Sequence, residues 1–117
     1  MKQALQITFH NMKPSKAVED KIQERAEKLS HFYEHISHCK VVVDIPHKHK
    51  HKGEAYHITI NIGVPQGNIV VSKGTEKGSS YEDVYVVIRD AFNAARRCIE
   101  DFARKRRGEV KTHSAMA

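Results

Sequence analysis

The chain has 117 residues, of which 20 are lysine or arginine and 14 are aspartate or glutamate, and its formal net charge is +6 at pH 7. This length is typical of one domain, and the positive charge favours an anionic partner, with nucleic acid ahead of a membrane surface. Residues 1–13 lack the apolar core of a signal peptide, and no stretch approaches the roughly 20 apolar residues of a spanning helix. We therefore expect a cytoplasmic protein that does not act at a membrane.

The first predicted elements are a strand and a helix. Residues 4–10 alternate apolar and polar side chains, which indicates a half-buried strand. Ser15 is a good N-cap, and a helix is predicted from there to about Ile36. Its apolar side is formed by Val18, Ile22, Leu29, Phe32 and Ile36.

This helix segregates its charges. Lys21, Arg25 and Lys28 lie on one edge of the apolar stripe, while most of the glutamates lie on the far side. An i, i+4 pair between Glu24 and Lys28 explains the position of Lys28 only in part. We interpret the basic edge as a candidate surface for phosphate groups.

Three further strands are predicted, at residues 39–46, 54–64 and 69–73. Residues 65–68 form a tight turn between the last two strands, and residues 73–79 form a flexible loop.

The stretch Ser80 to Gly108 is predicted to be one long helix with an N-cap at its first residue and a terminating glycine at its last. An apolar stripe is formed by Val84, Ile88, Ala91, Ala95, Cys98 and Phe102, flanked by Phe92 and Ile99. Outside it lie Arg89, Arg96, Arg97, Arg104 and Arg107. The helix dipole could explain arginines in the last turn, but Arg89 and Arg96 lie at least two turns earlier.

The element order is therefore β-α-β-β-β-α. Each helix has one apolar stripe and each strand one strongly apolar side, so we predict an α+β two-layer sandwich with a four-stranded mixed sheet and both helices on one face. The domain is expected to span residues 1–107, followed by a flexible C-terminal tail at 108–117. Basic edges on two neighbouring helices would line or bracket a groove and meet RNA recognised by shape.

Between the second and third strands lies an unusual basic run, His47, Lys48, His49, Lys50, His51 and Lys52. His-x-His pairs can bind zinc, but the three lysines would repel a cation and no carboxylate or cysteine adjoins the run. We favour a phosphate-contacting loop over a solvated hairpin end or a metal site, although adventitious metal binding stays open. No cofactor is indicated.

Catalytic chemistry finds little support. The sequence has no GxxxxGK[ST], GxGxxG or HExxH motif, and no nucleophile stands at a recognisable spacing from a base. Cys39 and Cys98 are interpreted as small core residues, because both lie in apolar patterns without a CxxC spacing. We expect a protein that is not an enzyme and has no small-molecule substrate.

Four segments of the chain carry a family resemblance. They are LQITFHNM, ERAEKLSHFYEHI, CKVVVDIPHKHKHKG and EDVYVVIRDAFNAARRCIEDFARKRRGEVK. In these segments the chain resembles the ribosome hibernation promoting factors and ribosome-associated translation inhibitors, over roughly residues 3 to 107. The resemblance implies binding to the small ribosomal subunit between head and body. Two basic helix faces would contact ribosomal RNA there and block the sites of messenger and transfer RNA.

Residue by residue, Lys28 in EKL is similar to the first-helix lysine of the family, and Arg97 in RRCI to its second-helix basic position. Arg25, Arg89 and Arg96 lie on the same faces and are expected to be further contacts. The chain departs from the family pattern at Glu100 and Asp101, where many members continue with lysine.

The resemblance also bears on assembly. The sequence after Arg107 is too short for the long C-terminal domain that dimerises ribosomes, so we expect a short form that is a monomer or weak dimer off the ribosome. Whether it promotes ribosome dimers or only inhibits translation stays open. The alternatives are a double-stranded RNA-binding domain, which has an α-β-β-β-α core, and a protein-binding regulator without nucleic acid contact.

Overall fold

A computed structural model describes residues 4–45, 56–74 and 84–116, with side chains up to residue 107. Six elements follow in the predicted order: β1 (Ala4–His10), α1 (Lys16–Phe32), β2 (His38–Asp44), β3 (His57–Val64), β4 (Gly67–Gly74) and α2 (Val84–Met116). The run from His47 to Lys52 and the N-cap at Ser80 lie outside the described residues. Of the loop predicted at residues 73–79, Lys73 and Gly74 belong to β4, and the rest also lies outside them.

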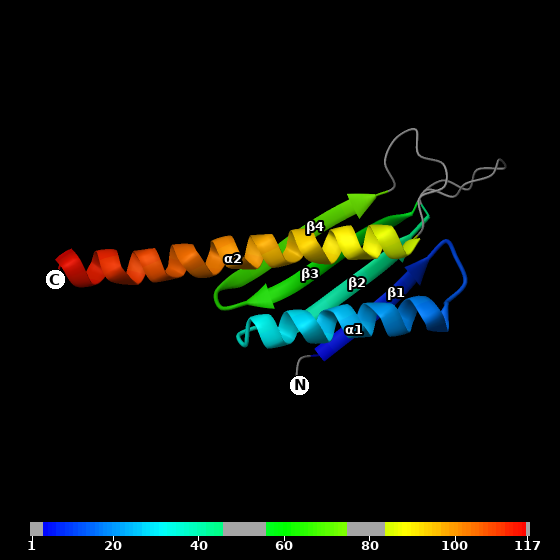
Figure 1. The fold of residues 1–117 in the computed structure, drawn as a ribbon, viewed down its shortest axis with the longest axis horizontal. Helices are drawn as coiled ribbons and strands as arrows, with labels where there is room; N and C mark the ends of the chain where they lie inside the picture. The colour runs from blue at the N-terminus through cyan, green and yellow to red at the C-terminus, as the bar shows by residue number, and fades with distance from the viewer. Residues whose placement is uncertain (1–3, 46–55, 75–83, 117) are drawn as a thin grey trace.

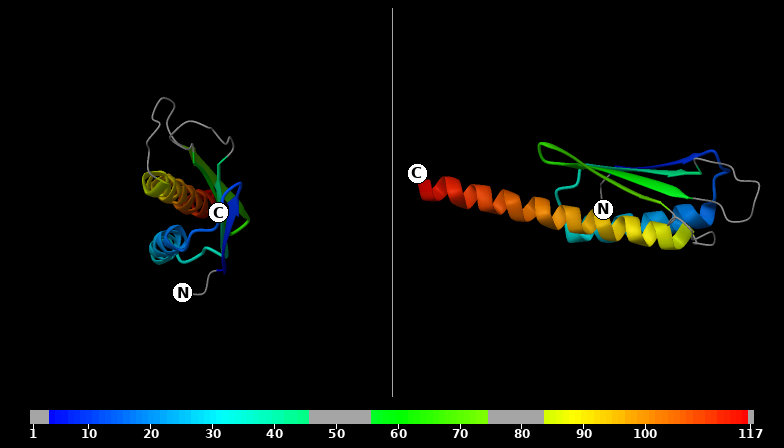
Figure 2. Two further views of the ribbon diagram at one scale, coloured as in Figure 1. Left: turned by 90° about the vertical axis from the view of Figure 1, so that its right-hand side faces the viewer. Right: turned by 90° about the horizontal axis from the view of Figure 1, so that it is seen from above.

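The four strands form one sheet in the order β1-β2-β3-β4 (Figure 1). The helical crossover through α1 makes β1 and β2 parallel, and Ala4 pairs with His38 at the start of their register. β2, β3 and β4 are antiparallel neighbours. Both helices cover the same face of the sheet (Figure 2), which confirms the predicted α+β sandwich.

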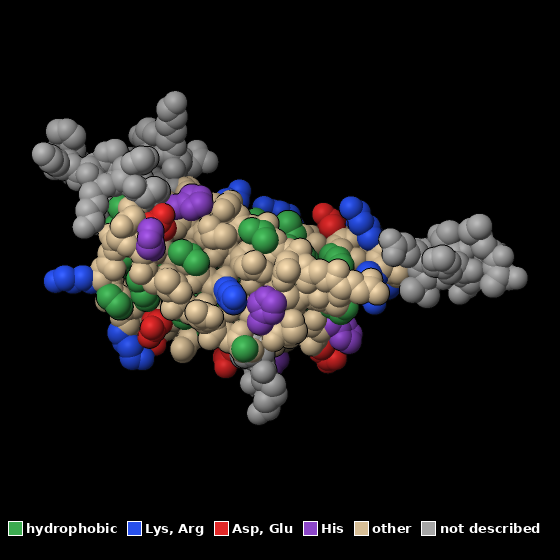
Figure 3. Space-filling view, turned by 180° about the vertical axis from the view of Figure 1, so that it is seen from behind, with side chains coloured by type: hydrophobic (Ala, Val, Ile, Leu, Met, Phe, Trp, Pro, Cys, Tyr) green, Lys and Arg blue, Asp and Glu red, His purple; other side chains and the backbone are tan. Residues whose placement is uncertain are grey.

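The core lies between the sheet and the two helices. Its fully buried side chains alternate along the two central strands, with Ile58, Ile60 and Ile62 of β3 pointing towards the helices. The opposite face of the sheet is uncovered. Seen from that side, hydrophobic side chains are scattered among polar and charged ones (Figure 3). Among the described residues no polar or charged side chain is fully buried, so the core is held together by apolar packing.

Helix α1 begins as predicted and ends earlier. The backbone N–H of Val18 donates to Ser15 Oγ at 3.3 Å, which confirms the N-cap. The helix ends at Phe32 rather than near Ile36, because Tyr33 adopts an extended conformation with φ −140° and ψ 117°. Ile36 is buried all the same, after the chain has turned back towards β2. The apolar periodicity thus continued past the end of the helix, which misplaced its boundary.

Helix α2 differs from the prediction at two points. Cys98 is exposed rather than in the core, since the buried stripe is shifted around the helix towards Val87, which was not predicted, and Ile99, which was predicted only to flank it. The helix also continues through Gly108 to Met116, because a glycine ends a helix only where it adopts the left-handed conformation. The boundary of the domain at residue 107 stays a prediction. Cys39 is buried as expected, and its burial raises the pKa of the thiol to about 11.

The hairpin between β3 and β4 is tighter than predicted. Val64 already pairs with Gly67, so only Pro65 and Gln66 form the turn. Gln66 has φ 69°, a left-handed conformation that suits glycine better than glutamine. Gly67 and Asn68, which were predicted to belong to the turn, are the first residues of β4 instead.

Gly63 of β3 provides a test of the open sheet face. A Cβ atom at this position would overlap the ring of His38 and the hydroxyl of Ser37. We expect Gly63→Ala to lower the free energy of unfolding by about 1 to 2 kcal/mol, measured by urea denaturation. In a background carrying His38→Ala and Ser37→Ala the same substitution should cost little. An equal loss in both backgrounds would show that side-chain crowding is not the cause.

Candidate nucleic-acid interface

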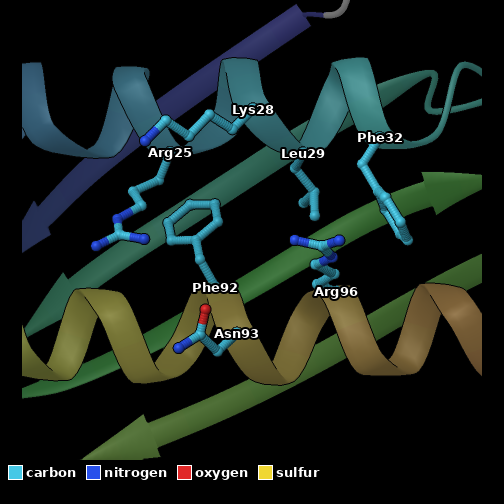
Figure 4. A pocket seen from close by; sticks show the side chains of 7 residues that line it. All are labelled: Arg25, Lys28, Leu29, Phe32, Phe92, Asn93 and Arg96. Carbon is cyan, nitrogen blue, oxygen red and sulfur yellow. The ribbon is translucent and has the colours of Figure 1, made fainter.

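The two helices lie side by side on the sheet and run in the same direction (Figure 1). Between them is a groove, called here the basic groove, to which both helices contribute side chains (Figure 4). Its lining residues are Arg25, Lys28, Leu29, Phe32, Phe92, Asn93 and Arg96. The predicted basic edge of the first helix thus faces the second helix.

The charge of the basic groove is of one sign. Three of its lining residues, Arg25, Lys28 and Arg96, are cationic, and none of the described residues that line it is acidic. Arg25 points from α1 towards α2 and Arg96 points from α2 towards α1, whereas Lys28 extends along α1 beside Arg25 (Figure 4). Such an arrangement raises the local concentration of anions and suits a phosphate chain.

An apolar base supports these charges. Leu29 and Phe92 are each only 4% exposed. The guanidinium carbon of Arg96 lies 4.4 Å from the centroid of the Phe32 ring, a cation–π contact that spans the two helices. Arg96 is therefore oriented by a partner that leaves its N–H groups free to donate to an acceptor.

Arg25 has an unused donor. Its Nε is buried and has no hydrogen-bond partner within the described part of the chain. Its guanidinium points away from α1 towards Phe92 on α2 (Figure 4). A desolvated donor without a partner is unfavourable, and an oxygen acceptor entering the groove would satisfy it.

Lys28 and Lys21 are both held by Glu24. Their Nζ atoms lie 3.6 and 3.2 Å from the carboxylate oxygens of Glu24. The hydrogen bond from Lys21, with the charges of both lysines, keeps the pKa of Glu24 below its usual range. These pairs are exposed and contribute little to stability. Lys28 lines the groove, whereas Lys21 does not.

The remaining predicted residues divide into three groups. Arg89 is exposed and pairs with Asp90 at 3.1 Å. Arg97 is exposed and lies about 100° further around α2 than Arg96, outside the lining of the groove. Arg104 pairs with Asp101 at 3.4 Å and lines a second hollow near the end of α1. Among the predicted contacts that lie in the described part of the chain, the structure therefore brings together Arg25, Lys28 and Arg96 in the basic groove.

Phe32, Phe92 and Asn93 were not predicted as site residues. Both phenylalanines were expected in the core, but Phe32 is 39% exposed. A signal for it was present, because Phe32 follows Arg25 by seven residues and Lys28 by four and so shares their side of the helix. No comparable signal marks Asn93, whose position depends on where the two helices touch.

No three histidine, cysteine, aspartate or glutamate residues in the described ranges are grouped so that they could hold a metal ion. Within those ranges no helix is both long and apolar enough to cross a membrane.

Residues 5–107 match the sequence model of one family, described as sigma 54 modulation protein / S30EA ribosomal protein. Two solved structures are similar in fold. One is a ribosomal subunit interface protein from Coxiella burnetii, with 12% sequence identity, a TM-score of 0.70, and coverage of 86% of this chain and 98% of that chain. The other is the N-terminal domain of Thermus thermophilus Protein Y, with 17% identity, a TM-score of 0.66, and coverage of 86% and 99%. Comparison with curated proteins gives no match.

Proposed function

This chain belongs to the sigma 54 modulation protein / S30EA ribosomal protein family, whose members are ribosome-associated factors, and we propose that it binds the small ribosomal subunit through ribosomal RNA. Bound there, it would block the channel of messenger and transfer RNA, and so inhibit translation or protect idle ribosomes. It would act in the cytoplasm as a binding protein, without catalysis.

The observation that supports this proposal is that the basic groove is lined by cations from both helices. Arg25, Lys28 and Arg96 come from two helices and converge on one concave surface without a described acidic residue in its lining. Either basic edge alone would be an ordinary solvated helix face. A groove with cations on both sides can hold a phosphate backbone, and phosphate contacts position a protein on RNA without reading its sequence.

The sheet distinguishes this protein from the alternative of a double-stranded RNA-binding domain. That domain has an α-β-β-β-α core, whereas here β1 precedes the first helix and pairs with β2 over seven positions. Family membership supports the same distinction. A protein-binding regulator without nucleic acid contact would leave Arg25 and Arg96, which form no ion pair among the described residues, without an assigned anionic partner.

Sucrose-gradient sedimentation with purified ribosomal subunits tests the proposal. We expect the protein to sediment with the small subunit at low salt and to be released steeply as salt rises from about 50 to 200 mM, because phosphate contacts displace counterions. Purified large subunits are the control. Protein that stays at the top of the gradient at low salt, or that binds both subunits alike, would contradict the proposal.

A further inference from the structure

A second hollow lies next to the basic groove, where α1 ends against the middle of α2. It has a volume of about 430 Å³ and shares Phe32 with the basic groove. This volume falls within the range of sites that take small organic groups. We call it the end pocket. It is larger than a bound phosphate requires, and apolar, basic and acidic residues all line it.

Aromatic and aliphatic side chains form the apolar part of the end pocket. Phe32 and Tyr33 come from the end of α1, and Ile99 and Ala103 come from α2. The Tyr33 ring is packed edge-on against Phe102 and His35, with centroid distances of 6.4 and 5.4 Å. These contacts hold the ring in place. Aromatic rings at an open concave surface are the groups on which unpaired nucleobases stack.

Cations lie around this apolar part. Arg104 and Arg107 line the end pocket, and Arg96 lies over Phe32, whose side chain joins the pocket to the basic groove. An RNA strand in the groove could therefore place one base in the end pocket and keep its flanking phosphates beside arginines.

Glu100 restricts which nucleobase the end pocket can bind. It lines the end pocket, yet among the described side chains it forms no ion pair, since Arg104 pairs with Asp101 instead. A carboxylate is a hydrogen-bond acceptor only and repels phosphate. Guanine presents two adjacent donors, N1–H and N2–H₂, on its Watson–Crick edge, which match the two oxygens of a carboxylate. Adenine, cytosine and uracil present no such adjacent pair.

We propose that the end pocket binds an unpaired guanine of the RNA strand that occupies the basic groove, an inference that rests on the proposed function. The base stacks on Phe32 and Tyr33, and the Glu100 carboxylate accepts from its N1–H and N2–H₂ groups. The protein thus adds recognition of one base to shape-based contact with phosphates.

Fluorescence anisotropy with labelled RNA hexamers tests this inference on the full chain. One hexamer contains only uridine and the other has a single guanosine at an internal position. We expect the guanosine hexamer to bind roughly tenfold more tightly, the discrimination typical of one bidentate contact. Equal affinity for the two hexamers, or no binding of either at concentrations where small subunits bind, would overturn the inference.

Glu100→Gln is the decisive variant. It removes a negative charge, so binding of the uridine hexamer should not weaken. The ratio of the affinities for the guanosine and uridine hexamers should fall to near one. Asp90→Asn on the same helix removes the same charge outside the end pocket and should keep the preference. A preference that survives Glu100→Gln would overturn the assigned role.

Competition with guanosine monophosphate shows whether the end pocket takes its base from RNA or from a free nucleotide. This nucleotide lacks the flanking phosphates, so it should displace the guanosine hexamer only at concentrations far above those of the hexamer. If it binds as tightly as the hexamer, the pocket serves a free nucleotide and the RNA assignment is wrong. Small-subunit sedimentation of the same protein keeps the two proposals apart, because it can succeed while the guanosine preference is absent.

Discussion

Replacing Arg25 and Arg96 together by glutamate is expected to weaken binding to the small ribosomal subunit on the order of a hundredfold, because each loses a charged hydrogen bond to phosphate. The slope of log affinity against log salt should also become less steep by about two units, one for each lost contact. Titration of labelled protein with small subunits at several salt concentrations measures both quantities.

The fold should survive this double substitution. Both side chains line the surface of the groove, and Arg25 Nε has no hydrogen-bond partner to lose. The cation–π contact of Arg96 with Phe32 is lost and contributes about 0.5 to 1 kcal/mol at an exposed site, so we expect the free energy of unfolding to fall by about 1 kcal/mol or less. A large loss of stability would show that the arginines are structural. A matched control is Lys13→Glu with Lys40→Glu, which changes the net charge equally at exposed positions outside the groove.

Arg96→Glu and Arg97→Glu, compared as single variants, separate the groove from the general charge of the helix. The two residues are adjacent and both exposed, but only Arg96 lines the groove. We expect the larger loss of affinity from Arg96→Glu. Equal losses would indicate that the whole basic face of α2 contacts RNA, as the family resemblance of Arg97 implies.

Much of the fold could be predicted because hydrophobic periodicity reports which face of each element is buried. The alternation of Ile58, Ile60 and Ile62 marked β3, and the spacing of Val18, Ile22 and Leu29 marked α1. The end of α1 could not be predicted in the same way. Ile36 continues the pattern and is buried, but from a connecting segment rather than a helix.

The candidate site was only half predictable. Periodicity placed Arg25 and Lys28 on one edge of their helix, but it could not show how far α2 is rotated about its own axis. That rotation decides that Arg96 enters the groove and Arg97 does not. It also exposes Cys98 and buries Val87. Contacts between distant elements set the rotation, and a single sequence carries little information about them.

The core and the groove are built from neighbouring sides of the same helices, and Leu29 and Phe92 belong to both. On α2, Ala91 and Ala95 are fully buried against the sheet, while Arg96 lies at the groove. The small alanines let the helix lie close to the strands, and the apolar burial that results stabilises the domain without using the cations. Binding and stability should therefore respond to different substitutions.

The largest loss of stability is expected from a substitution on β2, where a neighbouring residue provides a matched control. Val41 and Val42 are neighbours on this central strand, but Val41 is fully buried against the helices and Val42 is 36% exposed on the open face. Val41→Ala should lower the free energy of unfolding by about 2 to 3 kcal/mol, through lost burial and an unfilled cavity. Val42→Ala should change it by less than about 0.5 kcal/mol.

Urea denaturation of both variants, with unchanged m-values, measures the difference between the two faces of the sheet. A loss of 2 to 3 kcal/mol is a large fraction of the roughly 5 to 15 kcal/mol that holds a domain folded, so Val41→Ala should also bind fewer ribosomal subunits at elevated temperature. A comparable loss in Val42→Ala would mean that the open face is covered in solution.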